Sequence, residues 1–200
     1  MLKFALRMPM KSAQIPGMTD LIIEGHRIGV LFSQAEIAGR IEALAKEIAA
    51  RQPNKLLVVP VLKGSFIFAA DLIRAMHHAG LSPEVDFMIL ASYRENTKSS
   101  GRVEVLRDIE QAVKGRDVLL IDDILESGRT LAFAKDLISA RGARTVYTAV
   151  LLSKPGHLAA HIKADFQGFN CPDKFVVGYG MDMAHRFREL PFVGHVLSSA

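Results

Sequence analysis

The amino-acid sequence predicts an α/β fold in which a twisted, mostly parallel sheet is flanked by helices and carries a small additional subdomain. Apolar, strand-like runs alternate with helical patterns through the middle of the chain, which is typical of a parallel sheet with right-handed crossovers. The runs at residues 56–62, 118–121 and 145–152 have the length and composition of buried strands. From His157 onward the pattern is short and irregular, which predicts a small cap rather than more parallel sheet.

Length and composition fit one globular domain with a sizeable core. The chain has 200 residues, of which 50% are hydrophobic and 23% are charged. It contains no apolar run long enough for a transmembrane helix, and its first ten residues lack the features of a signal peptide. The one cysteine, Cys171, excludes an internal disulfide and fits the reducing cytoplasm. The net charge of +4 comes from scattered lysines and arginines, so we expect small anionic substrates and no nucleic-acid or membrane partner.

The N-terminal third is predicted to lead into the sheet through a helix. Residues 1–20 show no clean period and are interpreted as an arm that is disordered or part of the cap. The apolar runs at residues 21–23 and 28–31 indicate a short hairpin or an extended piece. Ser33-Gln34-Ala35-Glu36 is a capping-box pattern that predicts a helix start, and Pro53 ends this helix.

The middle of the chain predicts a strand, a helix and a long hairpin. In the strand at residues 56–62, Pro60 argues against a fully hydrogen-bonded central position. After it come the loop Lys63-Gly64-Ser65, a helix to His78, and a strand at residues 85–91. The polar residues 93–101 are interpreted as a mobile loop that returns through a strand at 102–106. We expect these divisions to give an arm at residues 1–20, a core at 21–153 and a cap at 154–200.

A stretch from Val118 to Leu131 carries the clearest chemical signal. Four apolar residues lead into Asp122-Asp123, and a short loop with Gly128 and two hydroxyl groups then opens a helix over 131–141. Free N–H groups at a helix N-terminus bind anions, and ligands of parallel sheets lie at the carboxyl ends of the strands. The stretch therefore predicts a phosphorylated ligand with a divalent metal.

The acidic pair has two interpretations. One aspartate can simply cap the helix or hold the loop, or the pair can organise hydrated Mg²⁺ or the hydroxyls of a sugar. The tail Gly128-Arg129-Thr130 is similar to the end of a P-loop, but Asp123 stands where that motif requires glycine. The sequence also contains no G-x-G-x-x-G motif for a dinucleotide.

The pattern of apolar strand, acidic pair, apolar pair, acidic residue and Ser-Gly-x-Thr resembles the signature of type I phosphoribosyltransferases. These enzymes bind 5-phospho-α-D-ribosyl 1-pyrophosphate (PRPP). Three further segments resemble the hypoxanthine-guanine branch: Leu62-Lys63-Gly64-Ser65, Ser92-Tyr93, and the hood segment from Pro172 to Asp182 with Phe187-Arg188-Glu189-Leu190-Pro191. The resemblance implies the type I phosphoribosyltransferase fold and transfer of the phosphoribosyl group to hypoxanthine or guanine, with release of pyrophosphate.

The resemblance also implies roles for individual residues of the ribose-phosphate half. Asp122 and Asp123 would hold the ribose hydroxyls and, through water, a Mg²⁺. The 5′-phosphate would be bound by Ser127, Gly128, Arg129 and Thr130. Lys63 and Gly64 would form the pyrophosphate loop, with a cis peptide at Leu62–Lys63, and Ser92 and Tyr93 would begin a loop that closes over the site.

The base half is likewise implied by the resemblance. Lys154 would donate to the purine O6, Phe175 would stack on the base and Val176 would contact its edge through the backbone. Asp182 would bind a second Mg²⁺ and Arg188 would contact pyrophosphate. Separately, Lys154 is also explained as a solvated charge, and Phe175 as an ordinary core aromatic.

Glu126 departs from the family pattern, which usually has Asp as the group that handles the proton on purine N7. The longer side chain could shift the carboxylate by about an ångström, enough to cost on the order of a hundredfold in rate. Two alternatives stay open from the residues: a regulator that binds PRPP or nucleotides and controls RNA or DNA, and a salvage enzyme that prefers xanthine. By resemblance we expect a homo-oligomer, either a dimer or a tetramer.

Overall fold

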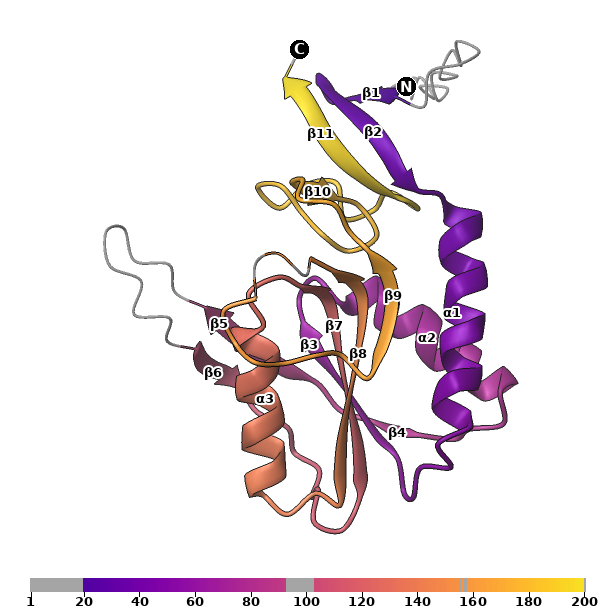
Figure 1. Cartoon of the computed structure of the whole chain (residues 1–200), viewed down its shortest axis with the longest axis vertical. Helices are drawn as coiled ribbons and strands as arrows, with labels where there is room; N and C mark the ends of the chain where they lie inside the picture. Colours follow the sequence, from indigo (N-terminus) through magenta and orange to yellow (C-terminus); the bar gives the residue numbers. More distant parts are fainter. Residues whose placement is uncertain (1–19, 93–102, 155, 157, 200) are drawn as a thin grey trace, which may run out of the picture.

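The computed structural model describes residues 20–92, 103–154, 156 and 158–199 (Figure 1). The N-terminal arm and the loop that begins at Tyr93 lie outside these described residues.

The larger sheet has seven strands and is mostly parallel, as predicted. Its order is β6-β5-β3-β7-β8-β9, and the short β4 pairs with β3. All of its pairs are parallel except β5 with β6. The strand bounds are β3 (Leu57–Leu62), β4 (Glu84–Val85), β5 (Met88–Ser92), β6 (Val103–Arg107), β7 (Asp117–Leu125), β8 (Thr145–Ser153) and β9 (Phe166–Asn170).

Three helices cover the two faces of this sheet (Figure 1). Helices α1 (Gln34–Ala49) and α2 (Phe66–His78) lie on one face, and α3 (Arg129–Ala140) lies on the other. Side chains alternate along β7 and contribute to the core on both faces of the sheet. Leu119 and Ile121 belong to the cluster under α1 and α2, while Val118 and Leu120 belong to the cluster under α3. The predicted capping box at Ser33 is present, with Ser33 Oγ accepting from the Glu36 N–H at 3.3 Å.

A second, antiparallel sheet lies beyond the main one and draws its strands from both ends of the chain (Figure 1). Its order is β1 (Asp20–Ile23), β2 (His26–Phe32), β11 (Val193–Ser199) and β10 (Val176–Val177). The N-terminal hairpin of β1 and β2 therefore pairs with the C-terminal strand β11 and lies in the second sheet, not in the core expected at residues 21–153. Pairing between segments more than 160 residues apart has no local signal in the sequence.

Two expectations about the main sheet were wrong in detail. The segment after His157 is not all cap, because β9 extends the parallel sheet beside β8. The acidic pair does not end its strand, since β7 continues to Leu125. Strand β3 is central, but Pro60 is not fully paired, as expected: it pairs with Ile121 of β7 on one side, and on the other side it falls between the pairs made with β4 and those made with β5.

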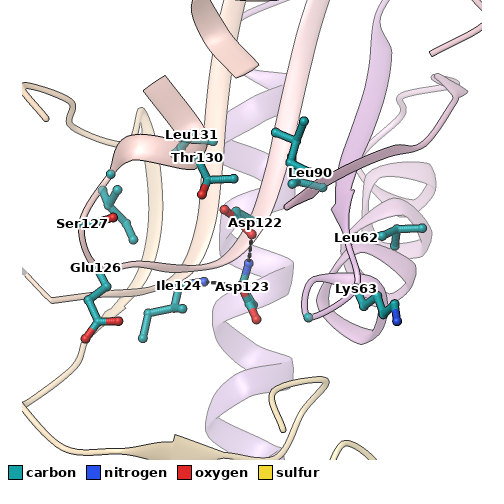
Figure 2. Close-up of a pocket in the computed structure, with 14 residues that line it drawn as sticks. Leu62, Lys63, Leu90, Asp122, Asp123, Ile124, Glu126, Ser127, Thr130 and Leu131 are labelled. Carbon is teal, nitrogen blue, oxygen red and sulfur yellow. Dashed lines mark hydrogen bonds between the residues drawn. The ribbon is translucent and has the colours of Figure 1, made fainter. Parts of the chain in front are cut away.

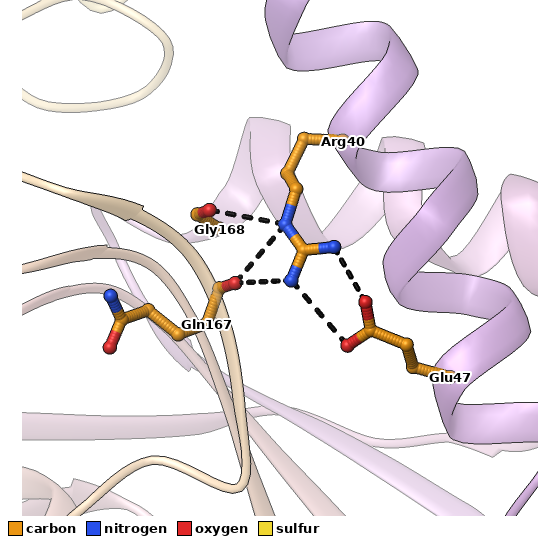
Figure 3. Close-up of polar contacts among 4 residues, drawn as sticks. All are labelled: Arg40, Glu47, Gln167 and Gly168. Atoms are coloured by element: carbon orange, nitrogen blue, oxygen red, sulfur yellow. Dashed lines mark hydrogen bonds and ion pairs between the residues drawn. The ribbon is translucent and has the colours of Figure 1, made fainter.

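The edge strand β9 is held by Arg40 of α1 (Figure 3). The Arg40 guanidinium donates to the carbonyl oxygen of Gln167 at 2.6 Å and to that of Gly168 at 3.1 Å. Glu47, one of its neighbours on α1, accepts from Arg40 Nη1 at 2.6 Å. An edge strand exposes unpaired carbonyl groups, and here a side chain occupies them. This clamp fixes the sheet edge next to the second sheet.

Candidate functional site

A pocket of about 250 Å³ lies where β3 and β7 end and α3 begins (Figure 2). This is the place where ligands of parallel sheets are expected. Eight of the residues predicted for the site line it together: Lys63, Gly64, Asp122, Asp123, Glu126, Ser127, Gly128 and Thr130. The structure thus brings seven residues of the predicted ribose-phosphate half into one cavity, together with Glu126, whereas Arg129 and Ser92 do not line it.

Asp122 and Asp123 form the acidic centre of the pocket. The Asp123 N–H donates to Asp122 Oδ1 at 3.0 Å, and the Ile124 N–H donates to Asp123 Oδ1 at 2.9 Å (Figure 2). Burial raises the pKa of Asp122 well above its ordinary value, and the neighbouring Asp123 charge raises it further. Burial also raises the pKa of Asp123, against a hydrogen bond from Asp122 and the positive charge of Arg188. Two close carboxylates with raised pKa values form a place for a cation or for hydroxyl donors.

The start of α3 offers free backbone donors to the same pocket. Its N-cap is Gly128, whose φ of +75° no ordinary side chain adopts easily. The N-cap glycine has no side chain that could cap this helix, Ser127 Oγ accepts from the Arg129 N–H only at 3.5 Å, and the first turn carries no acidic residue. The N–H groups of the first turn, together with the Ser127 and Thr130 hydroxyls, can therefore bind an anion such as a phosphate.

The loop after β3 forms the opposite wall and admits only glycine at position 64. A Cβ built on Gly64 would collide with the Asp123 carboxylate. On its other side, the loop contacts the segment between β10 and β11. A Cβ built on Gly180 of that segment would collide with the Gly64 carbonyl oxygen. The Leu62–Lys63 peptide is cis, in accordance with the resemblance.

Lys154 and Glu126 lie together beside the pocket. Lys154 Nζ donates to Glu126 Oε1 at 3.3 Å, and the Lys154 N–H donates to the Leu125 carbonyl at 2.8 Å. The Lys154 side chain is only 8% exposed, whereas that of Glu126 is 38% exposed. Figure 2 shows Glu126 directed away from Asp123. A buried ammonium and an accessible carboxylate side by side form a donor–acceptor pair.

The remaining predicted residues lie on or near the connections of the second sheet. Phe175 is 58% exposed, which makes it unlike a core aromatic, whereas Val176 is buried in β10. Asp182 accepts from Arg188 Nη2 at 2.6 Å, and Arg188 Nη1 donates to the Gly180 carbonyl at 2.6 Å. Asp182 is therefore held by Arg188 and does not meet the acidic pair: the described residues contain no group of three or more possible metal ligands.

Comparison with known proteins decides the family. The phosphoribosyl transferase domain family matches residues 30–184. A hypoxanthine-guanine phosphoribosyltransferase from Bacillus subtilis is 43% identical over 166 residues, which are 82% of this chain and 91% of that protein. The chain belongs to the hypoxanthine phosphoribosyltransferase family.

Solved members of the family share the fold. A hypoxanthine phosphoribosyltransferase from Staphylococcus aureus superposes with a TM-score of 0.79 at 34% identity, covering 84% of this chain and 90% of that one. A structure described as the glutamic acid mutant of an invariant aspartic acid in these enzymes has a TM-score of 0.80 at 35% identity, over 88% of this chain and 97% of that one. The type I phosphoribosyltransferase fold is thereby confirmed.

Several residues of this phosphoribosyltransferase site were not predicted from the sequence. Leu90 of β5 and Ile124 line the pocket, and neither position carried a chemical signal. Tyr179 donates its hydroxyl to Asp71 of α2, which ties the second sheet's connections to the core, and burial raises the pKa of this phenol. The available signal was Asp71, the single carboxylate in the sequence of α2. Ser92 ends β5 near the site, and Tyr93 lies outside the described residues.

Proposed function

We propose that the protein transfers the 5-phosphoribosyl group of PRPP to N9 of hypoxanthine or guanine, giving the nucleotide and pyrophosphate in purine salvage. One observation carries this: a single pocket joins two carboxylates, a helix N-terminus whose N-cap is glycine, and the Lys63–Gly64 loop. These are the partners that a ribose carrying a 5′-phosphate and a 1-pyrophosphate requires. The names of the relatives from Bacillus subtilis and Staphylococcus aureus agree with it.

We assign the 5′-phosphate to Ser127, Gly128, Arg129 and Thr130 at the start of α3. The ribose hydroxyls then reach Asp122 and Asp123, which accept hydrogen bonds from them. Lys63 and Gly64 face the pyrophosphate, and Arg188 supplies positive charge from the opposite side. Because bond breaking at C1 runs ahead of bond making, the reactive state is oxocarbenium-like, and these residues act by positioning and charge.

A divalent cation fits the acidic pair. Mg²⁺ is usually held by one or two carboxylates together with water and substrate phosphates, and Asp122 and Asp123 supply two carboxylates next to the phosphate positions. When bound, Mg²⁺ would neutralise the charge on the leaving pyrophosphate. Asp182 would join a second cation only after releasing Arg188, to which it is paired at 2.6 Å.

The Lys154–Glu126 pair fits the edge of a 6-oxopurine. O6 accepts hydrogen bonds and N7–H donates them, and these two atoms are neighbours on one edge of the ring. Lys154 Nζ and Glu126 Oε1 are a donor and an acceptor only 3.3 Å apart, so they complement this edge. Glu126 then accepts the N7 proton, Phe175 stacks on the ring and the Val176 backbone contacts the base edge. Ser92 ends β5, and we assign the segment that follows it, beginning at Tyr93, to closing over the bound substrates.

The proposal is tested by incubating the protein with PRPP, Mg²⁺ and hypoxanthine, guanine or xanthine in separate reactions. We expect formation of the nucleotide of hypoxanthine or guanine. Xanthine is the discriminating reaction, since Lys154 at O6 does not distinguish the three bases. Absence of nucleotide from all three, with PRPP still bound, would support a regulator in place of an enzyme.

Two further expectations accompany this function. None of the described helices is long and apolar enough to span a membrane, and the lone cysteine fits a reducing compartment, so we place the enzyme in the cytoplasm. We also infer a homo-oligomer, a dimer or a tetramer, by analogy with the family. Light scattering on the purified protein measures this state, and a monomeric mass would contradict it.

A further inference from the structure

The segment between β8 and β9 has an unusual relation to the phosphate loop. Parallel strands are normally joined by a helical crossover. Among the described residues between Ser153 and Phe166 there is no α-helix or strand. A helix would use its backbone N–H groups internally, whereas this irregular segment can donate them elsewhere.

Two of these N–H groups go to one carbonyl of the phosphate loop. The Ala159 N–H donates to the Ser127 carbonyl oxygen at 2.9 Å, and the Ala160 N–H donates to the same oxygen at 3.1 Å. Ser127 precedes the left-handed Gly128 and the first turn of α3. Both lone pairs of this carbonyl are thus occupied, which fixes the peptide plane that leads into the anion-binding turn.

Side chains of the segment close over the same glycine. A Cβ built on Gly128 would lie 2.6 Å from Ile162 Cγ2 and 3.4 Å from Leu158 Cδ2. Ile162 also packs on the cluster that contains Leu125 and Leu131, the residues flanking the loop on β7 and α3. Ile162 therefore packs on the Gly128 backbone from outside, while the pocket lies on the inner side.

We propose that residues 158–162 hold the phosphate loop in its binding conformation, and that Ile162 is a positioning residue for the 5′-phosphate of PRPP. This inference rests on the function proposed above. Ile162 touches no substrate; it acts through the backbone at Gly128. A small displacement of this loop weakens phosphate binding, because the N–H groups must all point at one anion.

The test uses three variants of the full chain: Ile162→Ala, Ile162→Val and Ile109→Ala. Ile109 is the matched control, since it is a partly buried isoleucine on the same cluster but remote from the loop. Valine keeps the Cγ2 methyl that meets Gly128. We expect Ile162→Ala to raise the KM for PRPP and the Kd for ribose 5-phosphate by about five- to tenfold, with kcat unchanged. We expect Ile162→Val and Ile109→Ala to leave both constants near those of the wild type.

The outcomes separate this inference from the proposed function. Ribose 5-phosphate binding, measured by calorimetry, needs no transferase activity, so an inactive protein that binds it still tests Ile162. If Ile162→Ala lowers Tm as Ile109→Ala does but leaves ribose 5-phosphate affinity intact, the segment only fills the core and the inference is wrong. Failure of the wild-type protein to bind ribose 5-phosphate would overturn it as well.

Discussion

The two ends of strand β7 carry aspartates in opposite situations. Asp117, at the start, is fully buried, accepts the Asn54 N–H at 2.8 Å and accepts from Arg144 Nε at 2.8 Å. Burial opposes its ionisation, but the hydrogen bonds from Arg144 and Asn54 outweigh it and lower the pKa of Asp117. At the other end, burial raises the pKa values of Asp122 and Asp123.

The difference lies in the partners and in the exposure: Asp117 is fully buried, whereas Asp122 and Asp123 are only partly buried at the pocket. Asp117 is satisfied by the protein itself, so its charge stabilises the fold. Asp122 and Asp123 receive backbone N–H groups but little positive charge, so their partners must come from a ligand. Substitutions at the start of β7 should thus cost stability and spare rate, while substitutions around its end should cost rate and spare stability.

The largest effect is expected at Glu126, just beyond the end of β7. Glutamine cannot accept a proton, so Glu126→Gln should lower kcat by about 10²- to 10⁴-fold, the range typical of general acid–base catalysis, with little change in PRPP affinity. Steady-state kinetics measures both. Glu42→Gln, on the exposed face of α1, is the control and should be silent. Near-normal turnover of Glu126→Gln would move the proton-handling role to another group.

The next largest effect is expected at Gly64, which faces the same end of the strand. Gly64→Ala places a methyl group against the Asp123 carboxylate. The resulting displacement should lower kcat/KM on the order of a hundredfold. Gly39→Ala is the control: nothing lies within 4 Å of its Cβ position on α1, and it should stabilise the protein by about 0.5–1 kcal/mol. Full activity in Gly64→Ala would show that the acidic pair tolerates movement.

At the start of β7 the effect should move from rate to stability. Asp117→Asn weakens the contacts with Arg144 and Asn54 inside the core, so the free energy of unfolding should fall by about 1–3 kcal/mol, while kcat stays unchanged. Denaturant titration and steady-state kinetics measure the two quantities. A loss of kcat in a fully folded Asp117→Asn protein would contradict the division between the two ends.

The opposite substitution sharpens the comparison. Asp122→Asn removes one of two neighbouring carboxylates that repel each other, so it should raise the Tm of the free protein while abolishing tight binding of PRPP. Thermal melts without and with PRPP and Mg²⁺ measure this. The wild-type Tm should rise on addition of PRPP and Mg²⁺, and that of Asp122→Asn should not. A lower Tm for free Asp122→Asn would mean that the carboxylate is satisfied by the protein.

The β7 region was predictable because its signals are local. A run of apolar residues, an acidic pair and a glycine before a helix lie within 14 residues, and each has its own physical meaning. The cis peptide at Leu62–Lys63 and the stacking role of Phe175 were predicted only from the resemblance to the family. The role of the start of β7 was not predicted, because the partner of Asp117, Arg144, is 27 residues away.

What the sequence did not predict depends on contacts between distant segments. Strand β9 was read as cap because its five residues follow an irregular crossover, and only pairing with β8 makes it part of the sheet. The pairing of β2 with β11 and the Tyr179–Asp71 contact have the same origin. Glu126 and Lys154 are close because each directly follows one of two paired strands, β7 and β8.

The smallest effect is expected in the pH dependence of the unfolding free energy, which tests directly whether the ionised Asp117 carboxylate stabilises the fold. The pKa of Asp117 is lower in the folded protein than in the unfolded chain, where Asp titrates at about 3.9. Its contribution is therefore fully present above that unfolded pKa and is lost as the pH falls through the lower, folded pKa. Asp86 and Asp108, whose pKa values are also lowered, contribute with the same sign.

The informative quantity is thus the difference in unfolding free energy between wild type and Asp117→Asn, measured by denaturant titration from pH 7 down to pH 3. That difference should be constant from pH 7 to about pH 5 and should shrink below the unfolded pKa of about 3.9. A difference that stays constant to pH 3 would show that the Asp117 carboxylate is not preferentially ionised in the fold, and the contrast between the two ends of β7 would no longer hold.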